Sequence, residues 1–187
     1  MKKTIKQTIA IEGFDGTGKS TIAKWISENY DFDYHKSPSE NFAAVRSNFD
    51  NQQTPIHERL AFYTGDCIRI SMMLNNDKDR KFVLDRYYYS TVAYHEAKYP
   101  GSTIEIQRIC QLLQKPDVVL LIKADYQTLK NRIITRNENI ENDELFLTEE
   151  LVNRIYENYK KVINVPIIEI ENNGDFENVI NQLKKHL

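Results

Sequence analysis

The sequence predicts an α/β domain in which helices cover both faces of a parallel β-sheet. Short apolar runs that fit buried strands alternate with longer segments that carry apolar residues at helical spacing. Strands of a parallel sheet are buried on both faces, so they are nearly continuous apolar runs. The length of 187 residues suits a single domain with a full core, spanning residues 1–187.

Each expected strand is a short run rich in β-branched or other apolar residues. The run Val-Val-Leu-Leu-Ile at 118–122 is the longest strongly apolar stretch, and the run at 8–12 leads directly into a glycine-rich turn. We expect strands at 8–12, 32–36, 82–85, 118–122 and 167–170.

The expected helices follow from apolar spacing and from residues suited to capping. The segment 56–74 repeats apolar residues at helical spacing through Leu60, Tyr63, Cys67, Ile70 and Leu74. Three side chains can cap the helices that follow them: Asp125, Thr148 and Asp175. We expect helices at 19–30, 42–49, 56–74, 90–96 and 103–113, from 125 to about 137, from 148 to about 163, and after 175.

Composition and charge exclude several classes of protein. The formal net charge of −2 provides no overall basic field for nucleic acid. The longest apolar run is far too short to span a membrane, and the apolar stretch near the N-terminus is too short for a secretory signal. Cys67 and Cys110 are far apart and fit a reducing compartment better than a disulfide scaffold. We therefore expect a cytoplasmic protein that binds neither nucleic acid nor membranes.

A phosphate-binding loop is predicted between the first strand and the first helix. The segment Gly13-Phe14-Asp15-Gly16-Thr17-Gly18-Lys19-Ser20 fits G-x-x-x-x-G-K-[ST] in the context that this motif requires. Its glycines allow backbone N–H groups to surround phosphate oxygens at a helix N-terminus. The residues expected to bind ATP are Gly13, Gly16, Thr17, Gly18, Lys19, Ser20 and Thr21, with Ser20 also a ligand of Mg²⁺. The motif alone does not separate kinases from GTPases or ATPases.

A second group of polar residues is expected at the same edge of the sheet. Asp85 and Arg86 follow one strand and Lys36 ends another, and ligands of parallel sheets bind beyond the carboxyl ends of the strands. Arg86 can fork onto phosphate oxygens, and Asp85 can orient a Mg²⁺-bound water or Arg86 itself. The alternative is a structural ion pair at a strand end.

The second motif resembles the thymidylate kinase family. Asp85-Arg86-Tyr87-Tyr88-Tyr89-Ser90-Thr91-Val92-Ala93-Tyr94 is similar to that family's D-R-Y-x-x-S-[ST]-x-A-Y signature. Glu12-Gly13-Phe14-Asp15-Gly16 also resembles the family's phosphate loop, which carries an aspartate. The resemblance implies a five-stranded parallel sheet, a homodimer, ATP and Mg²⁺ as cofactors, and transfer of the γ-phosphoryl group to the 5′-phosphate of a deoxynucleotide.

The resemblance also implies roles for individual residues. Asp15 would contact the sugar 3′-hydroxyl, Tyr94 would pack against C2′, and Phe62 would stack on the base. Arg136, or else Arg132, would contact the ATP phosphates beside a short lid around 137–147. Taken without the resemblance, Tyr94 and Phe62 fit ordinary packing residues, and the two arginines fit a solvated helix face.

Three positions depart from the family pattern on the acceptor side. Lys36 replaces an arginine, Asp66 replaces the arginine four positions after the stacking phenylalanine, and His95 replaces a glutamine or asparagine. An aspartate facing the base would favour a base that bears an amino group over thymine. The alternative is that Asp66 points away and pairs with Arg69.

Three other functions fit the sequence less well. A deoxynucleoside kinase commonly has a glutamate just before the proline, where this chain has Ser37. A GTPase would need N-K-x-D and D-x-x-G motifs, and neither is present outside the phosphate loop. A non-catalytic nucleotide-binding module is disfavoured by the intact Lys19, Ser20, Asp85 and Arg86. The nucleoside monophosphate kinase is therefore the favoured interpretation, with dTMP the leading acceptor.

Overall fold

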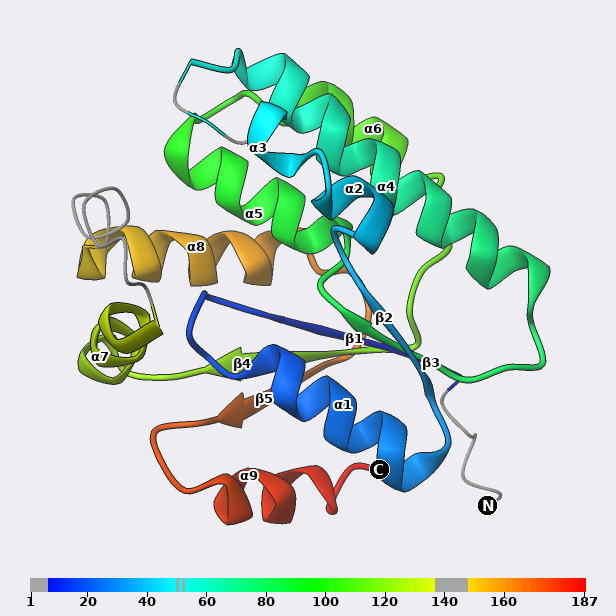
Figure 1. Cartoon of the computed structure of the whole chain (residues 1–187), viewed down its shortest axis with the longest axis vertical. Coiled ribbons are helices and arrows are strands. Elements are labelled where there is room, and N and C mark those ends of the chain that lie inside the picture. Colours follow the sequence, from blue (N-terminus) through cyan, green and yellow to red (C-terminus); the bar gives the residue numbers. More distant parts are fainter. Residues whose placement is uncertain (1–6, 50, 52, 137–147) are drawn as a thin grey trace.

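The computed structural model describes residues 7–49, 51, 53–136 and 148–187, and Figure 1 shows its arrangement. Five parallel strands form one sheet in the order β2-β3-β1-β4-β5. The strands are β1 (Thr8–Gly13), β2 (Asp33–Lys36), β3 (Phe82–Asp85), β4 (Val118–Lys123) and β5 (Ile167–Glu171). The expected five-stranded parallel sheet is therefore confirmed, with each strand within a residue of its predicted bounds.

The helices agree with the sequence pattern except in one segment. They are α1 (Lys19–Tyr30), α2 (Glu40–Ala43), α3 (Arg46–Phe49), α4 (Ile56–Asn76), α5 (Tyr88–Lys98), α6 (Ile104–Cys110), α7 (Tyr126–Arg136), α8 (Glu149–Val162) and α9 (Phe176–Leu183). The single helix expected at 42–49 is wrong, because a turn at residues 44–45 divides this segment into α2 and α3. The capping predictions hold: Asp125, Thr148 and Asp175 each accept a hydrogen bond from a backbone N–H of the following turn.

Two apolar layers hold the helices on opposite faces of the sheet. On one face α1 and α9 pack against side chains such as Ile9, Ile11 and Val83. On the other face α4, α5 and α8 pack against the alternate side chains of the same strands, such as Ala10 and Leu84. Figure 1 shows α1 and α9 below the sheet and α4, α5, α6 and α8 above it. The alternation along each strand makes both faces apolar, as the sequence pattern requires.

The strand order brings the predicted site residues together. In the register of the sheet, Asp85 at the end of β3 lies opposite Ile11 of β1 on one side and Lys36 of β2 on the other. The segments that follow β1, β2 and β3 therefore leave the sheet side by side at its carboxyl edge.

Two expectations fall on residues that the structure does not describe. The segment 137–147, expected to form a short lid, and the side chain of Arg136, expected to contact ATP, lie outside the described residues. Among the helices that are described, none combines the length and apolar character that a membrane span requires.

Candidate active site

The phosphate loop has a backbone that glycine makes possible. Gly13 and Gly18 have φ angles of 143° and 86°. A Cβ atom at Gly13 would lie 2.3 Å from the carbonyl oxygen of Ile122 on β4, and one at Gly18 would lie 2.7 Å from Nδ2 of Asn172. Both positions therefore require glycine for conformation, and Gly13 requires it for space as well because its neighbour is backbone.

The loop is held in place from the C-terminal half of the chain. The side-chain amide of Asn172 donates to the carbonyl oxygen of Thr17 at 2.9 Å. Nη1 of Arg132, from α7, donates to the carbonyl oxygens of Gly16 at 3.2 Å and of Asn172 at 2.9 Å. Arg132 thus lies against the phosphate loop, as expected for a residue near the donor phosphates, and not on a solvated helix face.

Lys19 lies in the loop with its ammonium group nearly buried. Its Nζ donates to the carbonyl oxygen of Phe14 at 2.6 Å, within the curve of the loop. Burial, assisted by the charge of Arg86, lowers the pKa of Lys19 to about 7 against the opposing effect of Asp15 and Asp85. A phosphate group bound in the loop would offset this desolvation, so the lysine is placed to receive an anion.

Ser20 and Asp85 form the pair expected for a metal ion. Oγ of Ser20 donates to Oδ2 of Asp85 at 2.5 Å, and the hydroxyl of Tyr34 donates to the same oxygen at 3.2 Å. Within the described part of the chain, His, Cys, Asp and Glu side chains form no cluster of three or more that could hold a metal ion. This donor set fits Mg²⁺, which takes one or two protein ligands and completes its shell with phosphate oxygens and water.

Arg86 is held in a defined position between the loop and α5. Its guanidinium forms an ion pair with Asp15, donates from Nη1 to Oγ of Ser90 at 3.0 Å, and lies 5.2 Å from the ring centre of Tyr94. Its φ angle of 73° is left-handed, which costs a residue other than glycine about 1–3 kcal/mol. Strain of this size persists only where the surroundings determine the conformation, and here they aim the arginine at the loop.

The charges of this pair reinforce each other. Burial opposes the charge of Arg86, but Asp15 raises the pKa of Arg86 well above its usual range. Desolvation opposes the charge of Asp15 only in part, since its side chain is 61% exposed, and Arg86, Lys19 and Arg46 hold the pKa of Asp15 well below its usual range. Both groups are therefore ionised at any physiological pH, and the site presents fixed charges to a ligand.

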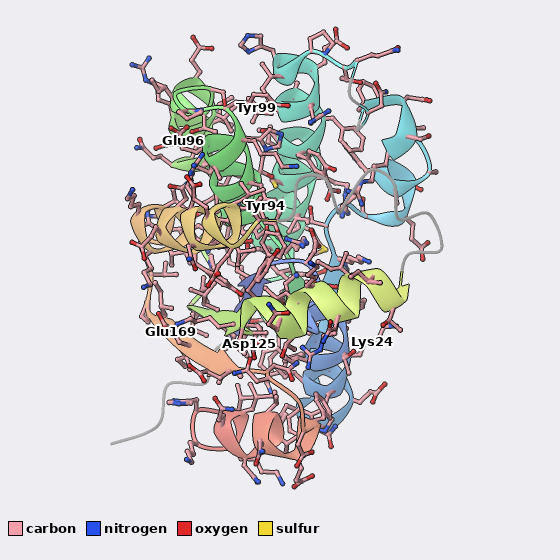
Figure 2. All side chains as sticks on the ribbon, turned by 90° about the vertical axis from the view of Figure 1, so that its left-hand side faces the viewer. Lys24, Tyr94, Glu96, Tyr99, Asp125 and Glu169 are labelled. Carbon is pink, nitrogen blue, oxygen red and sulfur yellow. The ribbon has the colours of Figure 1, made fainter. Side chains whose placement is uncertain are left out.

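Tyr94 forms a wall of the same site. Its ring stacks on Phe14 with centroids 5.7 Å apart, and its hydroxyl donates to Oδ2 of Asp15 at 3.4 Å. Tyr94 lies on α5 where this helix runs beside α8, and Figure 2 labels it there. Asp15, Arg86 and Tyr94 therefore lie together in the structure, and their contacts with a substrate stay predictions.

Phe62 does not lie open to a ligand. Its ring stacks on Phe49 with centroids 5.0 Å apart and an interplanar angle of 11°, and Phe42 contacts it at 5.5 Å. This corrects the expectation that Phe62 stacks on a base, because α2 and α3 cover the ring. The neighbouring Tyr63 instead lies near the site residues, with its ring 5.9 Å from that of His95 and the guanidinium of Arg46 at 6.0 Å.

Asp66 is a structural carboxylate, which corrects the expectation that it contacts a substrate. It is fully buried and accepts hydrogen bonds from Oγ of Ser37 at 2.7 Å, from Oγ and N of Ser39 at 2.6 and 3.2 Å, and from Nε of Arg69 at 3.1 Å. Four donors satisfy both oxygens. The alternative in which Asp66 pairs with Arg69 is the one observed, and the carboxylate also fixes the segment that follows β2.

Replacing Asp66 should destabilise the protein because four donors would lose their acceptor. We expect Asp66→Ala to lower the free energy of unfolding by about 3 kcal/mol, which is the usual cost of removing one partner of a buried, hydrogen-bonded charge pair. Glu150→Ala is a matched control, since Glu150 is 81% exposed in its pair with Arg154, and it should cost less than about 0.5 kcal/mol. Urea unfolding of the three proteins measures the difference, and equal stability of the two variants would contradict the assigned role.

His95 and Lys36 complete the expected acceptor side. His95 is buried, and its Nδ1 pairs with the carbonyl oxygen of Thr91 at 2.7 Å, so this contact orients the ring. Lys36 is exposed at the end of β2, beside Asp85 in the register of the sheet. Contact of His95 and Lys36 with the acceptor therefore stays a prediction.

Sequence reasoning missed a buried polar group beneath Arg86. Glu12, Ser90 and Tyr159 come from β1, α5 and α8, and Oγ of Ser90 lies within hydrogen-bonding distance of both the Glu12 carboxylate and the Tyr159 hydroxyl. Glu12 was the one available signal, because a charged residue that ends a buried strand needs partners inside the protein.

The strand order, the phosphate loop and the Arg86–Asp15 pair at the same sheet edge define the class, a P-loop nucleotide kinase. The sequence profile of the family described as "Thymidylate kinase" matches residues 11–183, which is most of the chain. The chain belongs to the thymidylate kinase family, and it is a nucleotide kinase.

Individual relatives agree with this assignment. The chain is 26% identical over 159 residues to the probable thymidylate kinase of Methanocaldococcus jannaschii, covering 83% of this chain and 84% of that protein. It is 28% identical over 197 residues to the probable thymidylate kinase of Thermococcus kodakarensis, covering 94% of each.

Solved structures share the fold. The thymidylate kinase of Candida albicans matches with a TM-score of 0.71 at 19% identity, covering 96% of this chain and 90% of that chain. The deoxyadenosine kinase of M. mycoides with bound dATP matches with the same TM-score at 20% identity, covering 96% and 97%.

Proposed function

We propose that the protein transfers the γ-phosphoryl group of ATP to the phosphate of a deoxynucleoside monophosphate, with dTMP as the leading acceptor. The observation that carries this proposal is that a group suited to donor phosphates and a group suited to the acceptor phosphate lie side by side at one edge of the sheet. Lys19, Ser20 and Asp85 form a site for donor phosphates and a metal ion, and Arg86 follows Asp85 directly and pairs with Asp15.

Each group has a role that its position allows. The loop amides and Lys19 would hold the β- and γ-phosphates, and Ser20 and Asp85 would hold Mg²⁺. The metal ion would supply positive charge to the bridging oxygens when bound. Arg86 would stabilise the charge on the transferred group from between the donor and acceptor phosphates, and its ion pair with Asp15 keeps the guanidinium there before substrates bind.

The acceptor base is proposed from the family and from the revised role of Asp66. An aspartate facing the base was the reason to expect a preference for bases with an amino group. Because Asp66 is buried and fully hydrogen-bonded, that reason no longer applies. Asp15 and Tyr94 remain the proposed contacts of the sugar, with His95 and Lys36 on the base and phosphate sides.

A coupled assay of ADP formation tests this proposal. We expect turnover with dTMP that exceeds turnover with dCMP, dAMP, dGMP and thymidine, each supplied with ATP and Mg²⁺. Turnover with thymidine but not with dTMP would favour the deoxynucleoside kinase, whose fold is similar. Ser37 speaks against that outcome, because it stands before Pro38 in place of an acidic base and its hydroxyl is engaged by Asp66.

An exposed apolar face supports a proposal about assembly. Exposed apolar side chains gather on α4 and at the end of α6, including Ile68, Met72, Ile109 and Leu112. The two segments adjoin, since the backbone N–H of Gln114 donates to Oγ of Ser71 at 2.8 Å. We infer that this face contacts a second copy of the chain in a cytoplasmic homodimer, and light scattering of the purified protein should give twice the mass of 22.0 kDa.

A further inference from the structure

The backbone at Arg86 directs the next residue into a buried carboxylate. The N–H of Arg86 continues the sheet by donating to the carbonyl oxygen of Ile11 at 3.0 Å, and its left-handed φ angle then turns the chain. After this turn the N–H of Tyr87 donates to Oε1 of Glu12 at 2.8 Å. Tyr87 is the N-cap of α5, and its side chain does not cap the helix. Glu12 of β1 therefore provides the hydrogen-bond acceptor for a backbone N–H at this end of the helix.

Ser90 connects the same carboxylate to Arg86. Oγ of Ser90 donates to Oε2 of Glu12, and Nη1 of Arg86 donates to Oγ of Ser90 at 3.0 Å. Glu12 is fully buried and Ser90 nearly so. The carboxylate therefore holds Arg86 twice, through the backbone of the adjacent residue and through the hydroxyl that the guanidinium contacts.

Tyr159 of α8 completes the group, and the charge on Glu12 sets the direction of its hydrogen bonds. Its hydroxyl lies 2.8 Å from Oγ of Ser90 and 3.3 Å from the carbonyl oxygen of Gly13, and its side chain is fully buried. With Glu12 ionised, the single proton of Ser90 goes to Glu12, so the one proton of Tyr159 is shared between Oγ of Ser90 and, at the longer distance, the carbonyl oxygen of Gly13. Ser90 then has one bond donated and two accepted, which is its full capacity.

We propose that Glu12, Ser90 and Tyr159 form a positioning network that holds Arg86 in its working orientation during phosphoryl transfer. The proposal rests on the role of Arg86 in the proposed function. None of the three residues needs to touch substrate, because each acts through the guanidinium or through the turn that presents it. Tyr159 is the member whose hydroxyl can be removed while its ring stays in the core, and the Arg86→Lys background separates an effect through Arg86 from an effect through the contact of Tyr159 with Gly13.

Tyr159→Phe removes one hydroxyl and keeps the ring in the core. We expect kcat for dTMP and ATP to fall about 10-fold, the effect of one net hydrogen bond, while both KM values stay within about 2-fold. Tyr156→Phe is the matched control: Tyr156 is buried on the same helix and donates to the carbonyl oxygen of Ile122 at 3.2 Å, outside the network. The control should change kcat by less than about 2-fold despite the loss of a comparable bond.

Glu12→Gln is the second variant. Burial raises the pKa of Glu12 to about 7, so both proteins are measured at pH 8, where the wild-type carboxylate is largely ionised. The amide keeps the shape but cannot accept from both Tyr87 and Ser90, so kcat should fall about 10- to 100-fold. Thermal unfolding checks that both variants are folded at the assay temperature. In the Arg86→Lys background the factor from Tyr159→Phe should shrink to less than about 2-fold, since the group that it positions is gone.

The outcomes separate the network from the function on which it rests. A wild-type protein without turnover on any nucleoside monophosphate overturns the proposed function. A wild-type protein that turns over, with kcat of folded Tyr159→Phe no lower than that of Tyr156→Phe, overturns the network. An equal loss from Tyr159→Phe in both the Arg86 and the Arg86→Lys backgrounds also overturns it, because the hydroxyl would then act elsewhere.

Discussion

Lys19→Ala should abolish nearly all turnover and leave the fold intact. The substitution removes the ammonium group that the phosphate loop surrounds, and with it the charge that would lie on the β- and γ-phosphates. We expect kcat to fall on the order of 1,000-fold, the upper range for loss of one preorganised charge stabiliser. Steady-state assays with saturating ATP measure this loss.

Stability measurements distinguish a site defect from a folding defect. The pKa of Lys19 is lowered from 10.5 to about 7 in the folded state, so between these pH values the unfolded chain holds more protons than the native state. The contribution of Lys19 to stability is therefore unfavourable below pH 7 and is relieved as the pH rises toward 10.5. Lys19→Ala should lack this rise and should be no less stable than wild type at pH 7.

A control lysine completes the test. Lys160 is exposed on α8 in a pair with Glu157, and Lys160→Ala should keep kcat within about 2-fold of wild type. Activity of Lys19→Ala within a few-fold of this control would show that the loop does not hold the donor phosphates in the proposed manner.

Arg86→Ala should lower kcat and weaken acceptor binding together. The guanidinium lies between the phosphate loop, where it pairs with Asp15, and α5, where it donates to Ser90, so it would contact both phosphate groups as charge develops on the transferred one. We expect kcat/KM to fall on the order of 100-fold or more. A fall in kcat that is larger than the rise in KM for the acceptor would indicate that Arg86 acts mainly in the transition state.

Two further variants show whether the loss in Arg86→Ala comes from the guanidinium at this position. Arg86→Lys keeps the charge but loses the planar fork, so it should recover only part of the rate. Arg80 is 56% exposed in its ion pair with Asp33, and Arg80→Ala should be nearly neutral. An unchanged kcat/KM for Arg86→Ala would reduce the Arg86–Asp15 contact to a structural ion pair.

Most of the fold follows from local pattern. The apolar runs at 8–12 and 118–122 are buried strands, and Asp125, Thr148 and Asp175 cap the helices that follow them, because periodicity and capping depend on neighbouring residues. The single helix predicted at 42–49 is wrong because the apolar residues of this segment suit one helix, while the observed turn at 44–45 brings Phe42 and Phe49 onto Phe62. Phe62 belongs to α4, so this packing cannot be predicted from the residues of 42–49 alone.

The same division applies to the site. Residue type and spacing were enough to predict the phosphate loop, the Asp85–Arg86 pair and the family, because these motifs are short and their chemistry depends on both. The roles of Asp66 and Glu12 are apparent only from the folded chain. Asp66 bonds a segment 27–29 residues away, and Glu12 reaches Ser90 across 78 residues. A buried carboxylate takes whichever donors the fold brings to it, and those partners come from chain topology, which no local spacing records.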